Sequence, residues 1–291
     1  MKWRLVLVLA VVLFGIANIA SADMIQGINI DFVTIGNAGN TADSTGYGAV
    51  DYEFSIGKYE VTNAQWNAFT TAVGVPIGNP SNAYSQSAYY TDTQQPTNNV
   101  SWYEAAQFCN YLTSGDKSLG AYLFSNTGDF LAIDRDSAMS AYGIAYVIPT
   151  EDEWYKAAYY TGSGYSLYAN GLNTIPAADN GWNYSGGVYD QPWDVGTGII
   201  EQNGTFDMMG NVWEWNEEII SVTYWGVRGG SFTDADYDLK SSTRDNGEPP
   251  WSEQSLVGFR VAAVTPVPSA VILGGLGLTF SGWLLKRKRM I

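Results

Sequence analysis

Residues 207–215, which read DMMGNVWEW, combine two carboxylates and two tryptophans in one short segment. Gly210 permits a backbone turn that residues with a Cβ atom resist, and the alternating residues 212–215 predict a strand just after this turn. We therefore expect Asp207 and Glu214 to face one small cavity. Two carboxylates, together with carbonyl oxygens freed by the turn, are ligands that Ca2+ prefers. The same spacing is also typical of a buried turn with solvated acidic side chains.

Further blocks of sequence occur in the order found in a known family. They read IGKYEVTNAQWNAF at 56–69, NVSWYEAAQFCNYL at 99–112, VIPTEDEWYKAAYY at 147–160, VRGGSF at 227–232 and LVGFRVAA at 256–263. Together with DMMGNVWEW, these blocks resemble the formylglycine-generating enzyme (sulfatase-modifying factor) family. The resemblance covers residues 28–264. It implies an α+β fold of the C-type-lectin-like class with little regular secondary structure.

The best-known members of this family oxidise a sulfatase cysteine to formylglycine with copper held by two cysteines. This chain has a single cysteine, Cys109, and one thiol cannot form a two-thiolate copper site. Where the family has its cysteine pair, the chain has Asp234 and, at or near the second position, Leu239. Cys109 lies among apolar residues of an expected helix, where a cysteine usually packs as a small hydrophobic residue. We expect no copper in this protein.

The chain has no histidine, which excludes Ser-His-Asp and Cys-His nucleophiles. Zinc or iron sites with histidine ligands are excluded as well, including the iron site of the related sulfoxide synthases. A pair of carboxylates could act on a glycosidic bond, but nothing in the spacing selects one pair among the 29 acidic residues. Carboxylate chemistry or a non-catalytic function remains.

The resemblance also implies calcium ligands. In the family's second calcium site, two side-chain ligands and two carbonyl ligands match, in chain order, Asp207, Gly210, Val212 and Glu214. In the first site, two ligands from a loop upstream have Asn183 and Tyr184 as their counterparts. The other ligands of that site cannot be aligned through the segment YDQPWDVGTG. We expect structural Ca2+ as the cofactor.

The family's active-site cleft is matched only in part. Its tryptophan and serine correspond to Trp213 and Ser231, and we expect Asp234 and Arg244 beside them. Aromatic rings next to polar groups suit a sugar or a peptide, so a cleft without thiolates favours a binding site for one of these ligands. The alternative is an active family member that uses these residues in a mechanism without cysteine. We favour the binding module over the enzyme.

The N-terminus has the features of an export signal. Lys2 and Arg4 precede the apolar run 5–16, and the ASA motif at 20–22 is typical of signal peptidase cleavage. Residues 1–22 are therefore expected to be a signal peptide, and residues 23–265 the mature domain. Roughly 245 residues suffice for one well-buried domain. With one cysteine the domain has no intrachain disulfide, so calcium and burial would have to stabilise it.

The C-terminal segment 266–291 combines prolines, the apolar run 270–285 and the basic cluster KRKR. It resembles the PEP-CTERM sorting tail of Gram-negative bacteria, which an exosortase-like envelope peptidase is thought to remove. The acidic residue expected between the two prolines is Val267 here. The resemblance implies release to the extracellular matrix. A plain transmembrane anchor in the cell envelope, with its basic cluster in the cytoplasm, is the alternative.

Loss of both ends would remove six of the 14 basic residues and none of the 29 acidic ones, which changes the net charge from −15 to −21. A domain of this charge repels nucleic acid, so we expect no nucleic-acid partner. It also concentrates divalent cations at its surface.

Three segments carry a capping-box pattern, which predicts a helix start in each. The pairs are Thr62 with Gln65, Ser101 with Glu104, and Thr150 with Glu153. By contrast, segments 36–48, 75–98 and 161–207 mix Gly, Asn, Pro and aromatic residues without period, which predicts irregular loops. Binding residues are expected mainly in the last two of these loops.

Overall fold

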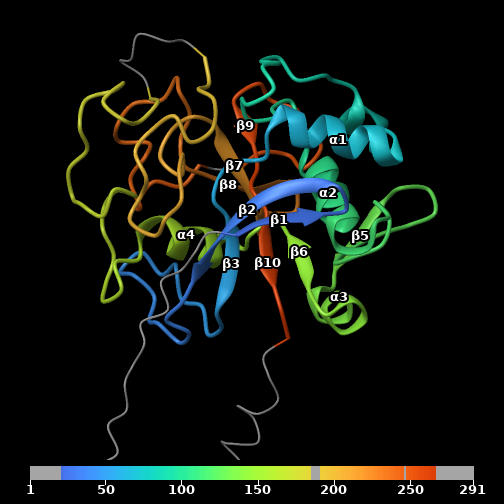
Figure 1. Ribbon diagram of the computed structural model, residues 1–291, viewed down its shortest axis with the longest axis horizontal. Coiled ribbons are helices and arrows are strands. Elements are labelled where there is room, and N and C mark those ends of the chain that lie inside the picture. Colours follow the sequence, from blue (N-terminus) through green and yellow to red (C-terminus); the bar gives the residue numbers. More distant parts are fainter. Residues whose placement is uncertain (1–20, 185–190, 246, 267–291) are drawn as a thin grey trace, which may run out of the picture.

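The computed structural model describes residues 21–184, 191–245 and 247–266 (Figure 1). Its helices and strands, in chain order, are β1 (Ser21–Ile25), β2 (Ile28–Ile35), β3 (Phe54–Gly57), α1 (Asn63–Val73), the 3-10 helix η1 (Ser81–Tyr84), α2 (Trp102–Ser114), β4 (Tyr122–Phe124), β5 (Phe130–Ile133), α3 (Arg135–Tyr142), β6 (Ala145–Val147), α4 (Glu151–Tyr159), β7 (Trp213–Ser221), β8 (Tyr224–Arg228), β9 (Val257–Gly258) and β10 (Ala262–Val264). This mixture of short helices and short strands confirms the expected α+β class.

The central sheet is antiparallel and has the strand order β1-β2-β3-β10-β6. Ala262 of β10 is the register partner of both Ile56 in β3 and Val147 in β6, so the last strand lies between two strands from the first half of the chain. Figure 1 shows α1, α2 and α3 grouped on one side of this sheet and α4 on the other. The sheet therefore joins the two ends of the domain, and its last strand, β10, ends at Val264.

The three predicted capping boxes are present. In α1, α2 and α4 the N-cap hydroxyl accepts from the N3 backbone N–H, and the N3 side chain accepts from the N-cap N–H. These contacts satisfy backbone donors that the first helical turn leaves unpaired. Helix α2 is buried along almost its whole length, and it contains Cys109, which is buried as expected.

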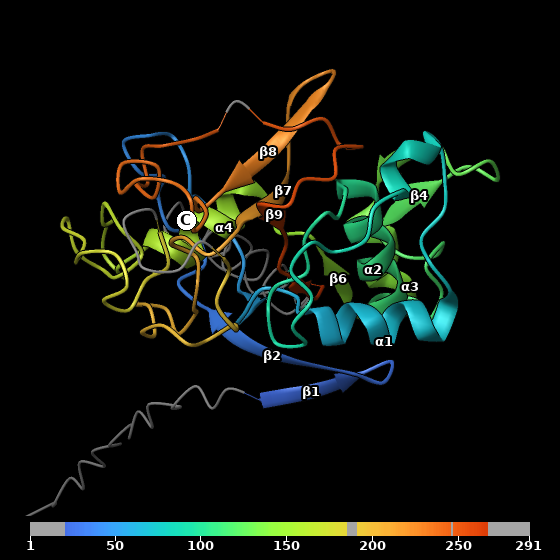
Figure 2. The same cartoon turned by 90° about the horizontal axis from the view of Figure 1, so that it is seen from above.

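A second sheet has the order β8-β7-β9, with β8 antiparallel and β9 parallel to β7. Strand β7 begins at Trp213, as the alternation after Gly210 predicted. Figure 2 shows the β7–β8 hairpin at the end of the molecule opposite β1. Segment 75–98 contains η1 as its regular element, and the described residues of 161–207 contain neither a helix nor a strand. These two segments are loops, as predicted.

Most of the predicted signal peptide, residues 1–20, lies outside the described residues, as do residues 267–291 of the predicted sorting tail. Ser21 and Ala22 are described, and they pair with Phe32 and Asp31 at the start of β1. Across the described ranges, none of the helices combines the length and the apolar character needed to cross a bilayer.

Candidate functional site

The turn around Gly210 packs against the backbone of Asn183. Gly210 has a φ of +90°, and a Cβ atom at this position would lie 2.1 Å from the Asn183 carbonyl oxygen. Asn211 also has a positive φ, and its N–H donates to the same carbonyl at 2.8 Å. A glycine is therefore required at position 210, both for its dihedral angle and for space. The contact brings the two loops with the predicted calcium ligands together.

Glu214 is fully buried and is paired with an arginine. Arg260 donates from Nε to Oε2 at 2.6 Å and from Nη2 to Oε1 at 2.5 Å, and the Trp154 indole donates to Oε2 at 2.7 Å. The remaining donors of Arg260 bond to backbone carbonyls, including Gly57 O at 3.0 Å. Arg260 lies in the apolar segment LVGFRVAA and was not among the predicted site residues.

Asp207 is buried without a salt bridge to any described residue. Its carboxylate accepts from the Gly196 N–H at 2.8 Å. Burial raises the pKa of Asp207 to about 6, and the nearby charge of Glu214 adds to the rise while Arg260 opposes it. The charge of Glu214 thus contributes to the raised pKa of Asp207, but Arg260 is the cation that Glu214 binds.

Two further glutamates, which the sequence analysis did not select, belong to this region. Glu60 accepts from Asn211 Nδ2 at 2.6 Å and from Val212 N at 3.3 Å, and Glu201 accepts from Thr205 and Met208. Burial raises the pKa of Glu201 to about 8 and that of Glu60 well above its usual value. We call Glu60, Glu201, Asp207 and Glu214 the buried acidic cluster. Among the described residues, the one salt bridge of the buried acidic cluster is that between Glu214 and Arg260.

The buried acidic cluster is spread out. Within the described ranges, no three Asp, Glu or Cys side chains converge closely enough to hold a metal ion by themselves. A calcium ion here would therefore need carbonyl and amide oxygens in addition to carboxylates.

Asn183 and Tyr184 provide one such oxygen. The Asn183 Oδ1 atom is buried and has no hydrogen-bond donor among the described residues, whereas its Nδ2 donates to Gln191 O at 3.0 Å and Asn211 Oδ1 at 3.2 Å. Tyr184 donates its hydroxyl to Pro176 O at 2.5 Å, which leaves the Tyr184 side chain occupied. A buried amide oxygen without a donor fits a hard cation.

Trp213, Ser231 and Asp234, which the resemblance assigns to the cleft, are joined by hydrogen bonds. Asp234 Oδ2 accepts from Trp213 Nε1 at 2.8 Å, from the Ser231 N–H at 2.8 Å and from Ser231 Oγ at 2.5 Å. Asp234 Oδ1 accepts from none of the described residues. The carboxylate at the family's first cysteine position therefore fixes the tryptophan and the serine beside it.

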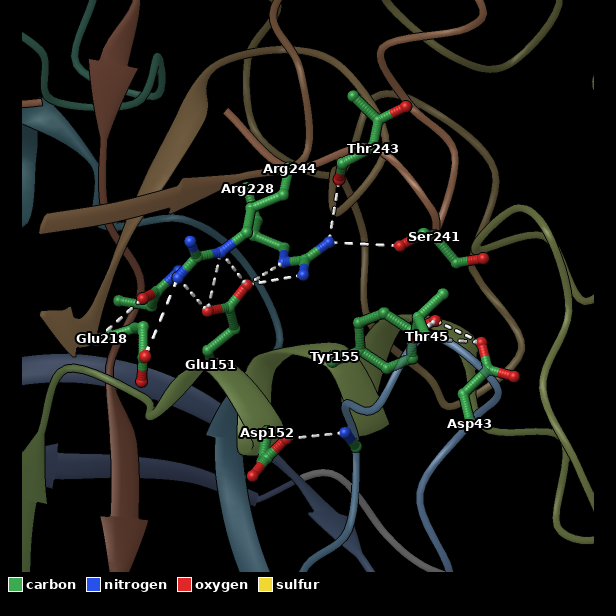
Figure 3. A network of polar contacts seen from close by, with 12 residues as sticks. Asp43, Thr45, Glu151, Asp152, Tyr155, Glu218, Arg228, Ser241, Thr243 and Arg244 are labelled. Carbon is green, nitrogen blue, oxygen red and sulfur yellow. Dashed lines mark hydrogen bonds and ion pairs between the residues drawn. The ribbon is translucent and has the colours of Figure 1, made fainter. Parts of the chain in front are cut away.

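Arg244, expected in the same cleft, instead takes part in a different network (Figure 3). It donates from Nε to Glu151 Oε1 at 2.8 Å and from Nη2 to Oε2 at 2.7 Å. Arg228 also donates to Glu151, and the Tyr47 ring lies 4.7 Å from the Arg228 guanidinium carbon. These contacts tie α4 to β8 and to the loop after it. We therefore assign Arg244 a structural position.

Leu239, which the resemblance places at or near the family's second cysteine position, is fully buried. Its carbonyl accepts from the Tyr159 hydroxyl at 3.2 Å. Leu239 thus belongs to the core that packs on α4, and its side chain has no atom that could bind a metal.

The sequence pattern of the sulfatase-modifying factor enzyme 1-like domain matches residues 36–265. A curated protein, chaperone protein LppX of Paenibacillus barcinonensis, is 28% identical over 188 residues, which are 56% of this chain and 61% of that protein. The chain thus spans less than two thirds of the length of this relative.

Three solved structures have a similar fold. Treponema denticola variable protein 1 has a TM-score of 0.62 and 21% identity, with 86% of this chain and 100% of that chain covered. CarF has a TM-score of 0.57 and 24% identity, with coverage of 82% and 98%. PvdO from Pseudomonas aeruginosa has a TM-score of 0.55 and 16% identity, with coverage of 82% and 95%. These likenesses confirm the C-type-lectin-like formylglycine-generating-enzyme fold expected from the sequence.

Proposed function

Because the chain belongs to the sulfatase-modifying factor enzyme 1-like domain family, we propose that it keeps the family fold without the copper chemistry and serves as an exported binding module for a glycan or a peptide. The observation that carries the proposal is the hydrogen bonding of Asp234. Asp234 occupies the first cysteine position, and its Oδ2 atom is engaged by Trp213 and Ser231. One carboxylate with three internal donors replaces a metal ligand.

The cleft retains groups that suit recognition. The Trp213 indole is held in one orientation by its hydrogen bond to Asp234, so its ring is a fixed surface on which the apolar face of a sugar or a peptide side chain can stack. Asp234 Oδ1 is available to accept from a ligand hydroxyl or amide. A rigid aromatic ring beside a free acceptor is a common arrangement in binding sites.

Calcium is part of the proposal as a structural ion. In the first site, the Asn183 Oδ1 atom, which has no donor among the described residues, would bind the ion together with Tyr184. In the second site, the Asp207 carboxylate would bind it together with the carbonyls of Gly210 and Val212. Glu214 would share its carboxylate with Arg260. When bound, the ion would supply positive charge to the buried acidic cluster and so stabilise the loops around Gly210.

The expected location follows from the two ends of the chain. We propose that the signal sequence directs export and that the C-terminal tail holds the protein at the membrane until an exosortase-like peptidase removes it. The cell envelope or the extracellular matrix is then the place where the module meets its ligand. The high negative charge of the mature domain suits a calcium-containing extracellular setting.

A glycan and peptide array probed with the calcium-loaded protein tests the proposed function. We expect selective binding that Asp234→Ala reduces at least tenfold, because Trp213 loses the acceptor that orients it. Arg244→Gln serves as the control, since its contacts lie in a different network, and it should leave binding unchanged. Turnover of a thiol peptide by the unmodified protein, or equal binding by the Asp234→Ala variant, would contradict the proposal.

A further inference from the structure

A separate cavity lies between α1, the loop around η1 and the start of α2. Its volume is about 380 Å³, and Trp66, Tyr84 and Glu104 line it together with several amides and hydroxyls. No lysine or arginine is among its lining residues, and neither are the cleft residues Trp213, Ser231 and Asp234. The cavity therefore has its own chemistry.

Glu104 is the charged group of this cavity, and it is 5% exposed. Its Oε2 atom accepts from the Ser101 N–H at 2.8 Å in the capping box, while Oε1 has no hydrogen-bond donor among the described residues. The four arginines in the described part of the chain are all paired with other glutamates. Glu104 thus places a carboxylate oxygen in the cavity without a cationic partner.

Two acidic side chains, Glu104 and Glu253, lie in and beside the cavity. Glu253 accepts from the backbone N–H groups of Ser85 and Gln86, each at 3.0 Å, and so holds the loop at the rim. Burial raises the pKa of Glu104 to about 8, and the charge of Glu253 adds to this rise. A cation inside the cavity would lower the pKa of Glu104 and so favour its ionised form.

Two aromatic rings, those of Trp66 and Tyr84, form part of the cavity wall. The Trp66 ring stacks on Phe108 with a centroid distance of 5.9 Å and an interplanar angle of 20°, and Phe69 and Phe259 contact it as well. Tyr84 accepts from Gln107 Nε2 at 3.4 Å. Aromatic rings attract organic cations through their faces and also pack on alkyl chains. A bare metal ion would need six or more oxygens and would gain nothing from these rings.

We propose that this cavity binds a primary ammonium group on an alkyl stem, as a lysine side chain of a peptide or protein partner presents it. The ammonium would pair with Glu104 Oε1, and the stem would lie between Trp66 and Tyr84. A neutral sugar would stack on the same rings but would leave the desolvated carboxylate without a counter-charge. The lysine side chain is therefore the better match.

Calorimetric titration of the protein above pH 8, where Glu104 is ionised and a lysine ammonium is still charged, tests this proposal. The probes are Nα-acetyl-lysine methylamide, its uncharged analogue Nα-acetyl-norleucine methylamide, n-butylammonium and methyl glucoside. We expect the lysine probe to bind at least tenfold more tightly than the norleucine probe. Butylammonium should compete with the lysine probe, which would show that the ammonium and its stem are recognised. If butylammonium does not compete, the peptide group of the probe is what the site recognises, and the proposal is overturned.

Variants place the binding at Glu104. Glu104→Gln should weaken the lysine probe at least tenfold while the circular dichroism spectrum stays unchanged, and Glu53→Gln, at an exposed carboxylate that does not line the cavity, should have no effect. Equal binding by Glu104→Gln, equal binding of the norleucine probe, or binding of the glucoside alone would each overturn the proposal. The array test depends on Asp234 and this test depends on Glu104. Failure of one proposal can therefore be distinguished from failure of the other.

Discussion

Glu214 and Arg260 form a salt bridge in which both side chains are fully buried, with N–O distances of 2.6 and 2.5 Å. Glu214 belongs to β7, and Arg260 lies between β9 and β10, so the pair ties the second sheet to the end of the central sheet. In the family resemblance, Glu214 stands at a calcium ligand. Here the carboxylate binds an arginine that the chain itself supplies.

Loss of one partner should be costly. Glu214→Gln removes the carboxylate that pairs with the buried Arg260, and we expect the free energy of unfolding to fall by about 3–5 kcal/mol. Urea denaturation measures this change. The double variant Glu214→Gln with Arg260→Gln should lose less than the sum of the two single variants, because it leaves no unpaired charge.

The matched control is the pair Arg244 and Glu218, in which Glu218 is exposed. Its N–O distance is 3.9 Å and the Glu218 side chain is 49% exposed. Glu218→Gln should therefore change the free energy of unfolding by less than about 1 kcal/mol. Equal effects of the Glu214 and Glu218 substitutions would contradict the structural role assigned to the buried pair.

Calcium should raise the melting temperature. At pH 7 Asp207, whose pKa is raised to about 6, is mostly ionised and buried beside other carboxylates, so a bound cation stabilises the folded state. We expect a chelator to lower the melting temperature of the unmodified protein. In Asp207→Asn the chelator should have a smaller effect, because one ligand charge is missing. A melting temperature that does not respond to the chelator would refute the calcium assignment.

The sequence predicted the parts of this molecule that depend on short-range chemistry. The capping boxes at Ser101 and Thr150, the turn at Gly210 and the buried position of Cys109 follow from local propensity and apolar neighbours. The C-type-lectin-like fold came from the resemblance of six ordered blocks, since no periodicity in the chain specifies how β10 enters between β3 and β6.

The site was predicted less completely because its buried charged side chains pair with residues that are distant in the sequence. Glu214 and Arg260 are 46 residues apart, and Glu60 and Asn211 are 151 residues apart. A charged residue in the apolar run LVGFRVAA is a signal of a buried pair, but it does not identify the partner. For the same reason, the sequence did not identify Glu151 on α4 as the ion-pair partner of Arg244.

Glu104 should make stability depend on pH. Its folded-state pKa is about 8, above the ordinary value of 4.5, so the folded protein holds this proton more tightly than the unfolded chain. Its contribution is fully present below pH 4.5 and is lost as the pH rises towards 8. In Glu104→Gln this loss should be absent, and the variant should melt higher than the unmodified protein at pH 8. Parallel melting curves against pH for the two proteins would contradict this assignment.

The C-terminal tail should be dispensable for folding. Strand β10 ends at Val264, and Thr265 and Pro266 are exposed, so truncation after Thr265 removes no described core residue. A protein of residues 23–265 should be soluble and should melt at the same temperature as the full chain. In the native host, mass spectrometry should find a C-terminus near Pro268. An intact tail in membrane fractions, with no released form, would support the plain anchor.

The most direct test of the central claim is copper-dependent oxidation of a sulfatase-type cysteine peptide by the purified protein. With Asp234 bonded to Trp213 and Ser231, and Leu239 buried, we predict that added copper produces no formylglycine. A family enzyme with both cysteines serves as the positive control. Formylglycine detected by mass spectrometry, at a rate that depends on copper and on this protein, would contradict the account and identify the chain as an active oxidase.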